Sequence, residues 1–122
     1  MIKIRRLFKS FTYSFRGLRK VVHEEQNLKI QLIAAFFIAM LAWYFRVNRI
    51  EWILLILSSG LVILAEVVNS AIERVTDVLK PRINGYVKEI KDIMAAAVMI
   101  TAVTSVIVGV IIFYPYVLNL LH

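Results

Sequence analysis

The order of apolar and polar residues divides the chain into one amphipathic segment followed by three apolar ones. In the first segment the apolar residues recur at alternating steps of four and three, the spacing of one helical face: Ile4, Phe8, Phe11, Phe15, Leu18 and Val22. Basic residues occupy many of the other positions. The pattern predicts an amphipathic helix over residues 1–27 that lies in a membrane interface, with its phenylalanines toward the lipid.

The three apolar runs predict three membrane-spanning helices, at residues 28–46, 50–79 and 93–118. Trp43 and Trp52 suit interfacial anchors at one end of the first two spans. The turn between these spans is short, so the second helix should run antiparallel to the first. The predicted fold is a single domain: an all-α membrane protein with three transmembrane helices plus an N-terminal amphipathic surface helix.

A polar stretch, residues 80–92, is predicted to be a loop, because Pro81 and the pair Asn84-Gly85 are turn signals. Pro115 is expected to mark fraying at the end of the last span. Three spans place the two termini on opposite sides of the membrane. The loop and the amino terminus then lie on the same side.

Composition agrees with a membrane protein. Of the 122 residues 61% are hydrophobic and 19% are charged, and the mean hydropathy is +0.78. A soluble domain of this size is usually about half apolar and about a quarter charged. The chain contains no cysteine, which excludes disulfides, thiolate zinc sites and a thiol nucleophile.

The net charge of +7 resides in the first 23 residues, which hold seven basic side chains and no acidic one. In the remainder, basic and acidic residues balance. By the positive-inside rule we expect a cytoplasmic amino terminus. A basic arm also suits nucleic acid, but the rest of the chain leaves little polar surface, so we expect no nucleic acid as a partner.

A stripe of polar side chains interrupts the apolar pattern in the second half of the predicted second span. Its members are spaced i, i+3, i+4, i+7 and i+11, which places them on one helical face: Glu66, Asn69, Ser70, Glu73 and Asp77. An acid at bilayer depth, such as Glu66, marks a functional site by default. Glu66 and Glu73 are separated by about 10 Å along the axis, so they cannot chelate one ion together. The alternative is that Glu73 and Asp77 simply lie on the water-exposed end of a helix that leaves the membrane, with Glu73 paired to Arg74 or Lys80.

No sequence motif for phosphate binding by a glycine-rich loop is present in the chain. If phosphates bind, side chains must hold them, and the candidates are Arg6, Arg19 and Lys91. Lys91 is equally explained as a cation that snorkels at the start of a span. Glu24 or Glu25 could face Glu73 across a helix contact and form a two-carboxylate seat for Mg²⁺. A histidine metal site is not expected, because His23 and His122 are far apart in the sequence.

The residues from Glu66 to Asp77 read E-V-V-N-S-A-I-E-R-V-T-D, and Lys91-Asp92 follows fourteen residues later. This resembles the signature E-x-x-N-[ST]-[AS]-[IL]-E-x-x-x-D of the bacterial diacylglycerol kinase and undecaprenol kinase family. Residues 13–19 and 25–30 also look like the family's amino-terminal helix and its entry to the first span. The resemblance covers nearly the whole chain.

The resemblance implies a multi-pass protein of the bacterial inner (plasma) membrane, a homotrimer with active sites between subunits. Glu66 would be the general base that takes the proton of a lipid hydroxyl, and Asn69 would orient the reacting groups. Glu25 and Glu73 would ligate Mg²⁺ on ATP, and Lys91 would neutralise the transferring phosphoryl group. The remaining positions implied around the nucleotide, or in support of the site, are Arg6, Tyr13, Asp77 and Asp92.

Two positions depart from the family's pattern or leave its register open. Met94 stands where the family usually has a small residue. Because Glu24 is adjacent to Glu25, either glutamate could align with the family's metal ligand, and Asn27, two residues after Glu25, favours Glu25.

Three functions remain open at this point. The first is ATP-dependent phosphorylation of a membrane lipid alcohol, either undecaprenol or diacylglycerol. Residues 111–116 and the motif around Asn27 look more like the branch of the family that uses the polyprenol. The second is a proton or ion relay through Glu66 in a small oligomeric channel. The third is a basic membrane-surface adaptor without catalysis.

Overall fold

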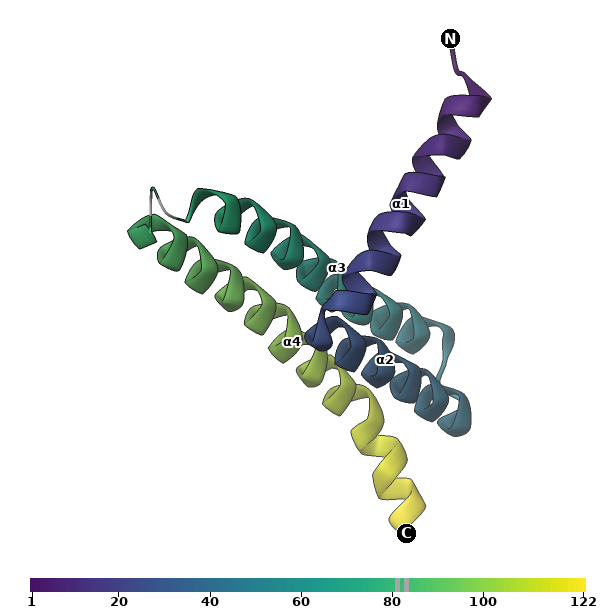
Figure 1. Ribbon diagram of the computed structural model, residues 1–122. Helices are drawn as coiled ribbons and strands as arrows, with labels where there is room; N and C mark the ends of the chain where they lie inside the picture. Colours follow the sequence, from purple (N-terminus) through teal and green to yellow (C-terminus); the bar gives the residue numbers. More distant parts are fainter. Residues whose placement is uncertain (81, 83) are drawn as a thin grey trace.

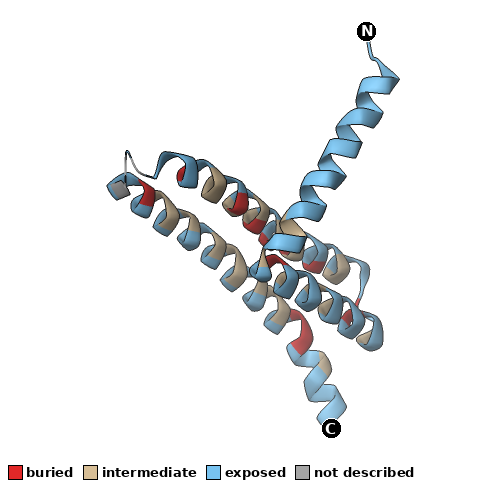
Figure 2. Cartoon of the chain, viewed as in Figure 1, coloured by how far each residue is buried: buried red, intermediate tan, exposed pale blue. Residues whose placement is uncertain are grey.

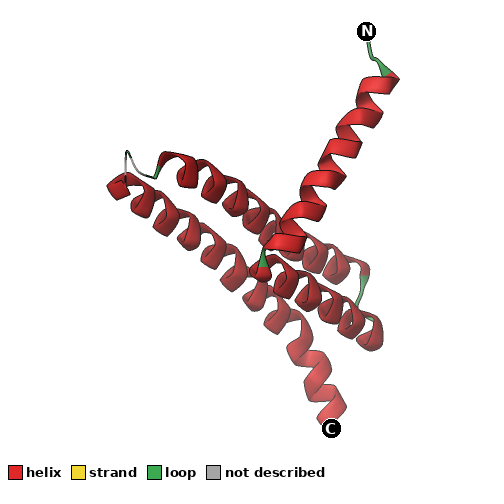
Figure 3. Cartoon of the chain, viewed as in Figure 1, coloured by secondary structure: helices red, strands yellow, loops and turns green. Residues whose placement is uncertain are grey.

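The computed structural model describes residues 1–80, 82 and 84–122, and in these residues it contains helices and no strand (Figure 3). The four helices are, in chain order, α1 (Ile4–Glu24), α2 (Gln26–Phe45), α3 (Arg49–Leu79) and α4 (Asn84–Leu121). Three of them are long and apolar enough to cross a membrane, over Gln26–Phe45, Arg49–Leu79 and Gly85–Leu121. The prediction of an all-α protein with three spans after an N-terminal helix is confirmed.

Helix α1 projects away from the other three helices (Figure 1). Nearly all of it is exposed (Figure 2), including Phe8, Phe11 and Phe15 on the apolar face predicted from the sequence. The helix ends at Glu24, and the extended backbone of Glu25 (φ −102°, ψ 114°) separates α1 from α2. The change of direction therefore occurs at one residue, without a proline or glycine.

Helices α2 and α3 are antiparallel and joined by a tight turn. Arg46 has φ 53° and ψ 51°, the left-handed conformation that often ends a helix. Asn48 then caps α3: its side chain accepts from the N–H of Glu51 at 2.8 Å, while the Glu51 carboxylate accepts from the N–H of Asn48 at 3.0 Å. This reciprocal capping box fixes where α3 begins.

Helix α3 packs against the other helices with its polar side inward. Ser58, Glu66, Ser70 and Thr76 are buried, whereas Ile56, Leu57, Leu64, Val68 and Val75 are exposed. In water this arrangement would be unfavourable, but lipid tails are as apolar as these side chains. Of the polar stripe predicted from the sequence, Glu66 and Ser70 are buried, Asn69 and Glu73 are half-buried, and Asp77 is exposed.

A cluster of buried apolar residues lies where the α2–α3 turn meets the last third of α4. It contains the buried residues Ala42, Val47, Leu55, Ile112 and Phe113. The Phe45 ring lies 6.1 Å from the Phe113 ring and 5.7 Å from that of Tyr116. The Tyr116 hydroxyl donates to Glu51 Oε1 at 2.5 Å. These contacts fasten the carboxyl-terminal part of α4 to the start of α3.

At the opposite end, α3 and α4 run side by side well beyond the start of α2 (Figure 1). The predicted loop over residues 80–92 is wrong for most of its length, because α4 already begins at Asn84. From Tyr86 to Asp92 no glycine or proline interrupts the helix, and Val87 is buried. Pro81, the other predicted turn signal, lies outside the described residues.

Pro115 does not end α4, which continues to Leu121 and is longer at both ends than the predicted span of 93–118. Proline has no N–H to donate to the carbonyl one turn earlier, and this defect commonly bends a helix. Figure 1 shows α4 changing direction in its carboxyl-terminal part. The expected fraying at Pro115 is wrong, because the helix continues past this residue to Leu121.

Candidate active site

Glu66 lies on the inward face of α3 and is 6% exposed. Its Oε1 accepts a hydrogen bond of 3.4 Å from Nε2 of Gln31, which belongs to α2. The sequence analysis did not predict Gln31 as a partner of Glu66. The signal that could have indicated it is the presence of a polar residue near the start of an apolar span. The structure therefore pairs the buried acid with an amide that leaves one carboxylate oxygen free of that bond.

One turn further along α3, Asn69 and Glu73 form a second polar pair. Asn69 Nδ2 donates to Glu73 Oε1 at 3.2 Å, so the amide orients the carboxylate. Thr76 donates from its hydroxyl to the backbone carbonyl of Glu73 at 2.9 Å. Within residues 1–80, 82 and 84–122, Glu73 has no ion pair. Its carboxylate is thus held in place while keeping its charge uncompensated.

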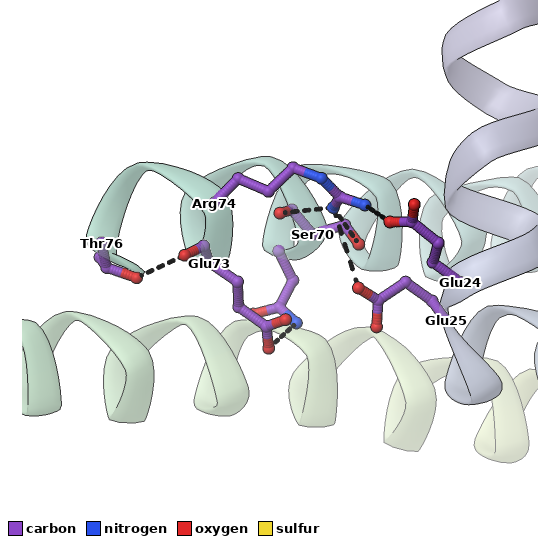
Figure 4. A network of polar contacts seen from close by, with 7 residues as sticks. Glu24, Glu25, Ser70, Glu73, Arg74 and Thr76 are labelled. Carbon is purple, nitrogen blue, oxygen red and sulfur yellow. Dashed lines mark hydrogen bonds and ion pairs between the residues drawn. The ribbon is translucent and has the colours of Figure 1, made fainter. Parts of the chain in front are cut away.

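Arg74 connects α3 to the junction of α1 and α2 (Figure 4). Its guanidinium forms an ion pair with Glu24 and lies 3.8 Å from Glu25 Oε1. It also donates to the backbone carbonyl of Ser70 at 3.1 Å and to the Ser70 hydroxyl at 3.2 Å. The alternative that Glu73 pairs with Arg74 or Lys80 is therefore wrong in the described part of the chain, because Arg74 points to the two glutamates of the junction.

Arg74 also distinguishes Glu24 from Glu25. The guanidinium engages Glu24 directly, whereas the 3.8 Å contact with Glu25 is too long for a hydrogen bond. Figure 4 shows Glu73 pointing away from Arg74, so the guanidinium does not lie over it. Glu25 is thus held by its longer ion pair with Arg74, and Glu73 by the hydrogen bond from Asn69. Among the described residues no group of three or more potential metal ligands occurs.

Lys91, near the start of α4, donates from Nζ to Asp77 Oδ1 of α3 at 3.0 Å. Both side chains are more than a third exposed, which makes the pair a weak contributor to stability. Lys91 also lines a pocket of about 420 Å³ together with Lys80, Lys88 and Asp92. Three amines around one pocket give this end of the α3–α4 pair a positive surface.

Three predicted residues lie on α1, and the structure does not bring all of them to the others. Arg6 and Tyr13 are exposed on the part of the helix that projects away from the bundle (Figure 1). The Tyr13 ring lies 5.8 Å from the Arg16 guanidinium, a cation–π distance. Arg19 is closer to the junction and lines a groove with His23 and Lys29. A single chain therefore assembles Glu25, Glu66, Asn69 and Glu73, but not Arg6 or Tyr13.

Comparison with known proteins gives consistent matches. The chain matches the family model for "Prokaryotic diacylglycerol kinase" over residues 12–113. It is 32% identical over 113 residues to the undecaprenol kinase of Bacillus subtilis, covering 93% of this chain and 92% of that protein. It is 36% identical over 96 residues to the diacylglycerol kinase of Helicobacter pylori, covering 79% and 75%. It is 32% identical over 111 residues to the diacylglycerol kinase of Escherichia coli, covering 91% of each chain.

Proposed function

Because the chain belongs to the prokaryotic diacylglycerol kinase family, we propose that this membrane lipid kinase uses ATP to phosphorylate undecaprenol and forms undecaprenyl phosphate. The observation that carries the proposal is the buried carboxylate of Glu66 on a spanning helix, bonded to Gln31 and one turn from the Asn69–Glu73 pair. A charged group in a span is costly to keep and is retained for function.

Glu66 is the general base of the proposed reaction. The lipid hydroxyl gives its proton to the Glu66 carboxylate, and the hydroxyl oxygen forms a bond to the γ-phosphorus as the bond to the β-phosphate oxygen breaks and ADP leaves. The burial of Glu66 supports this role, because a primary alcohol that carries a long hydrocarbon chain meets the protein at the edge of the lipid layer. Asn69, held against Glu73, orients the groups around the base.

Glu25 and Glu73 fit Mg²⁺. The ion takes carboxylate oxygens, usually from one or two side chains, and completes its shell with phosphate and water. When bound, Mg²⁺ would neutralise charge on the phosphates of ATP. In the proposed site Glu73 is oriented by Asn69, and Arg74 pairs more closely with Glu24 than with Glu25, which supports Glu25 as the metal ligand.

Lys91 and its neighbours bind the phosphates from the water side. Lys91 offers a cation that Asp77 holds at 3.0 Å, and Asp92 borders the same pocket. Arg6 and Tyr13 would reach the nucleotide only from a neighbouring copy, because α1 carries them away from its own bundle. This supports active sites between subunits, and the family resemblance adds that the assembly is a homotrimer in the bacterial plasma membrane. The basic amino terminus is proposed to lie in the cytoplasm.

Lys91→Met should lower kcat/KM for ATP by about tenfold to a hundredfold, because a preorganised cation beside the transferring phosphoryl group is lost. Asp77→Asn should lower it by less than about tenfold, since Lys91 keeps its charge and loses only its support. Initial rates at varied ATP, with saturating lipid, measure both. An Asp77→Asn effect as large as that of Lys91→Met would contradict this division of roles.

Diacylglycerol is the second candidate substrate, favoured by the names of the Helicobacter pylori and Escherichia coli relatives. Both lipids present one primary hydroxyl above apolar chains, so the chemistry is the same. The proton relay and the membrane-surface adaptor considered for the sequence are set aside, because the chain belongs to a kinase family.

The test is phosphoryl transfer from γ-labelled ATP to each lipid in one micelle system with purified protein. We expect the rate with undecaprenol to exceed that with diacylglycerol by at least about tenfold, a preference of about 1.4 kcal/mol. Removing Mg²⁺ with a chelator should abolish transfer to either lipid, and restoring it should recover the rate. Equal rates, or a preference for diacylglycerol, would overturn the proposed substrate.

A further inference from the structure

A pocket of about 490 Å³ lies beside the turn between α2 and α3, at the end of the spans opposite the candidate active site. Its lining consists of three aromatic side chains, one cation and one alanine: Trp43, Tyr44, Trp52, Arg46 and Ala42. Helix α2 has 20 residues and is about 30 Å long, so the pocket is about one hydrocarbon thickness away from Glu25. The pocket therefore lies at the level of the lipid headgroups on the other surface of the membrane.

The walls of this pocket are held in place by the protein itself. Trp52 packs against the cluster of buried apolar residues between the α2–α3 turn and α4. The Tyr44 ring lies 5.1 Å from the Phe45 ring in an edge-on arrangement, and Phe45 packs against the same cluster. The backbone N–H of Arg46 donates to the carbonyl of Trp43 at 3.3 Å. The pocket is thus formed before a ligand enters it.

Arg46 gives the pocket a positive charge. Its side chain is exposed and forms no ion pair within the part of the chain that the structure describes. The nearest acid in the sequence is Glu51, whose Oε1 accepts from the N–H of Asn48 at 3.0 Å and from the hydroxyl of Tyr116 at 2.5 Å. Glu51 is therefore engaged by the helix cap and by α4, and it does not line the pocket.

We propose that this pocket binds the phosphodiester headgroup of an anionic glycerophospholipid, with the phosphate on the Arg46 guanidinium. A guanidinium can form two parallel hydrogen bonds to phosphate oxygens, and the indole N–H groups are further donors. The aromatic rings would lie against the glycerol and the first part of the acyl chains, as amphipathic rings do at a membrane interface.

An anionic headgroup suits the pocket better than a zwitterionic one, because the second carries a cation that would lie near Arg46. A soluble phosphate ester offers the same phosphate without acyl chains, so the aromatic walls favour the lipid. The inference does not depend on which lipid alcohol is phosphorylated, because the pocket and the candidate active site are at opposite ends of the spans.

Quenching of tryptophan fluorescence tests the site, because the chain has two tryptophans and both line the pocket. The wild-type protein is placed in phosphatidylcholine bilayers, and part of the lipid is replaced by brominated phosphatidylglycerol or brominated phosphatidylcholine. We expect saturable quenching, with phosphatidylglycerol binding about fivefold to tenfold more tightly, because hydrogen bonds between charged groups are stronger than neutral ones. Equal quenching by the two brominated lipids would overturn the proposal, since the residues would then be general interfacial anchors.

Arg46→Gln and Arg49→Gln form a matched pair. Both arginines are exposed at the same turn, but only Arg46 lines the pocket. Arg46→Gln should abolish the preference for phosphatidylglycerol and leave the lipid kinase activity within about twofold, because the pocket is about 30 Å from the site. Arg49→Gln should keep the preference, and Arg46→Lys should keep part of it, since an ammonium retains the charge without the planar fork. Equal losses in Arg46→Gln and Arg49→Gln would contradict a site in this pocket.

Two further measurements locate the ligand and identify its source. Trp43 is 79% exposed and can meet any lipid beside the helix, whereas Trp52 is half-buried, so Trp43→Phe isolates the signal of Trp52. We expect the selective quenching to persist in this variant, and its loss would overturn the proposal. Glycerol phosphate added to the bilayers should not reduce the quenching. Competition by this soluble ester would contradict the assignment to a lipid.

Discussion

Glu66→Gln should lower kcat by about 10³-fold while leaving the affinity for ATP nearly unchanged, because general base catalysis contributes about 10² to 10⁴. The amide that replaces the carboxylate is nearly isosteric and can still bond to Gln31, so the helix contact survives. The variant loses the acceptor for the hydroxyl proton, not the phosphate-binding side chains. Single-turnover rates and equilibrium binding of a labelled ATP analogue measure the two quantities separately.

Glu51→Gln is the control for that experiment. Glu51 lies near the other end of the same helix, where it completes the capping box with Asn48. Glutamine serves in a capping box as glutamate does, so this change should keep the fold and the turnover. Unchanged turnover in Glu66→Gln would end the assignment of the base. Equal losses in both variants would attribute the effect to the structure of α3.

Glu73→Gln and Glu25→Gln should each lower kcat/KM for ATP by about a hundredfold, which is about 2.7 kcal/mol of transition-state stabilisation. Each change removes one of the two charges proposed to hold Mg²⁺. The dependence of the rate on Mg²⁺ should shift to higher concentration in both variants. Titrating Mg²⁺ at fixed ATP and lipid gives this shift for each protein.

Glu24→Gln separates the two neighbouring glutamates. Arg74 pairs with Glu24, and both side chains are well exposed, so losing this ion pair should change the rate and the Mg²⁺ requirement little. The three variants carry the same chemical change within one region, which makes them directly comparable. A large effect of Glu24→Gln with a small effect of Glu25→Gln would reverse the proposed assignment of the metal ligand.

The helices and the polar stripe could be predicted from the sequence because both depend on local periodicity. A span needs a long apolar run, and the inward face of α3 follows from residues spaced three and four apart. The spacing of Glu66, Asn69 and Glu73 is therefore enough to place them on one helical face. The family signature added roles to these positions, and only the family itself is confirmed.

Partners between helices were not predictable in the same way. The hydrogen bond from Gln31 to Glu66 depends on how α2 is rotated about its axis relative to α3. The spacing of residues within one helix does not determine that rotation. The suggested pairing of Glu73 with Arg74 had a physical weakness, because adjacent residues point in different directions from a helix. Arg74 instead reaches across to Glu24.

The error at residues 80–92 has a related cause. Asn84 and Gly85 are found in turns, but the same residue types also occur at the first positions of helices. Local sequence does not distinguish a turn inside a loop from the start of a helix. In this protein the segment is helical and Val87 within it is buried. That burial depends on the tertiary structure, which the local sequence does not contain.

The unequal lengths of the helices determine where water-soluble and lipid-soluble molecules can meet. Helix α2 has 20 residues and spans about 30 Å, the thickness of the hydrocarbon layer, whereas α3 and α4 have 31 and 38 residues. Figure 1 shows α3 and α4 continuing side by side beyond the start of α2. The shorter α2 thus leaves this end of α3 and α4 uncovered. In the proposed reaction a nucleotide would reach the polar stripe from the side there, while the lipid stays in the membrane.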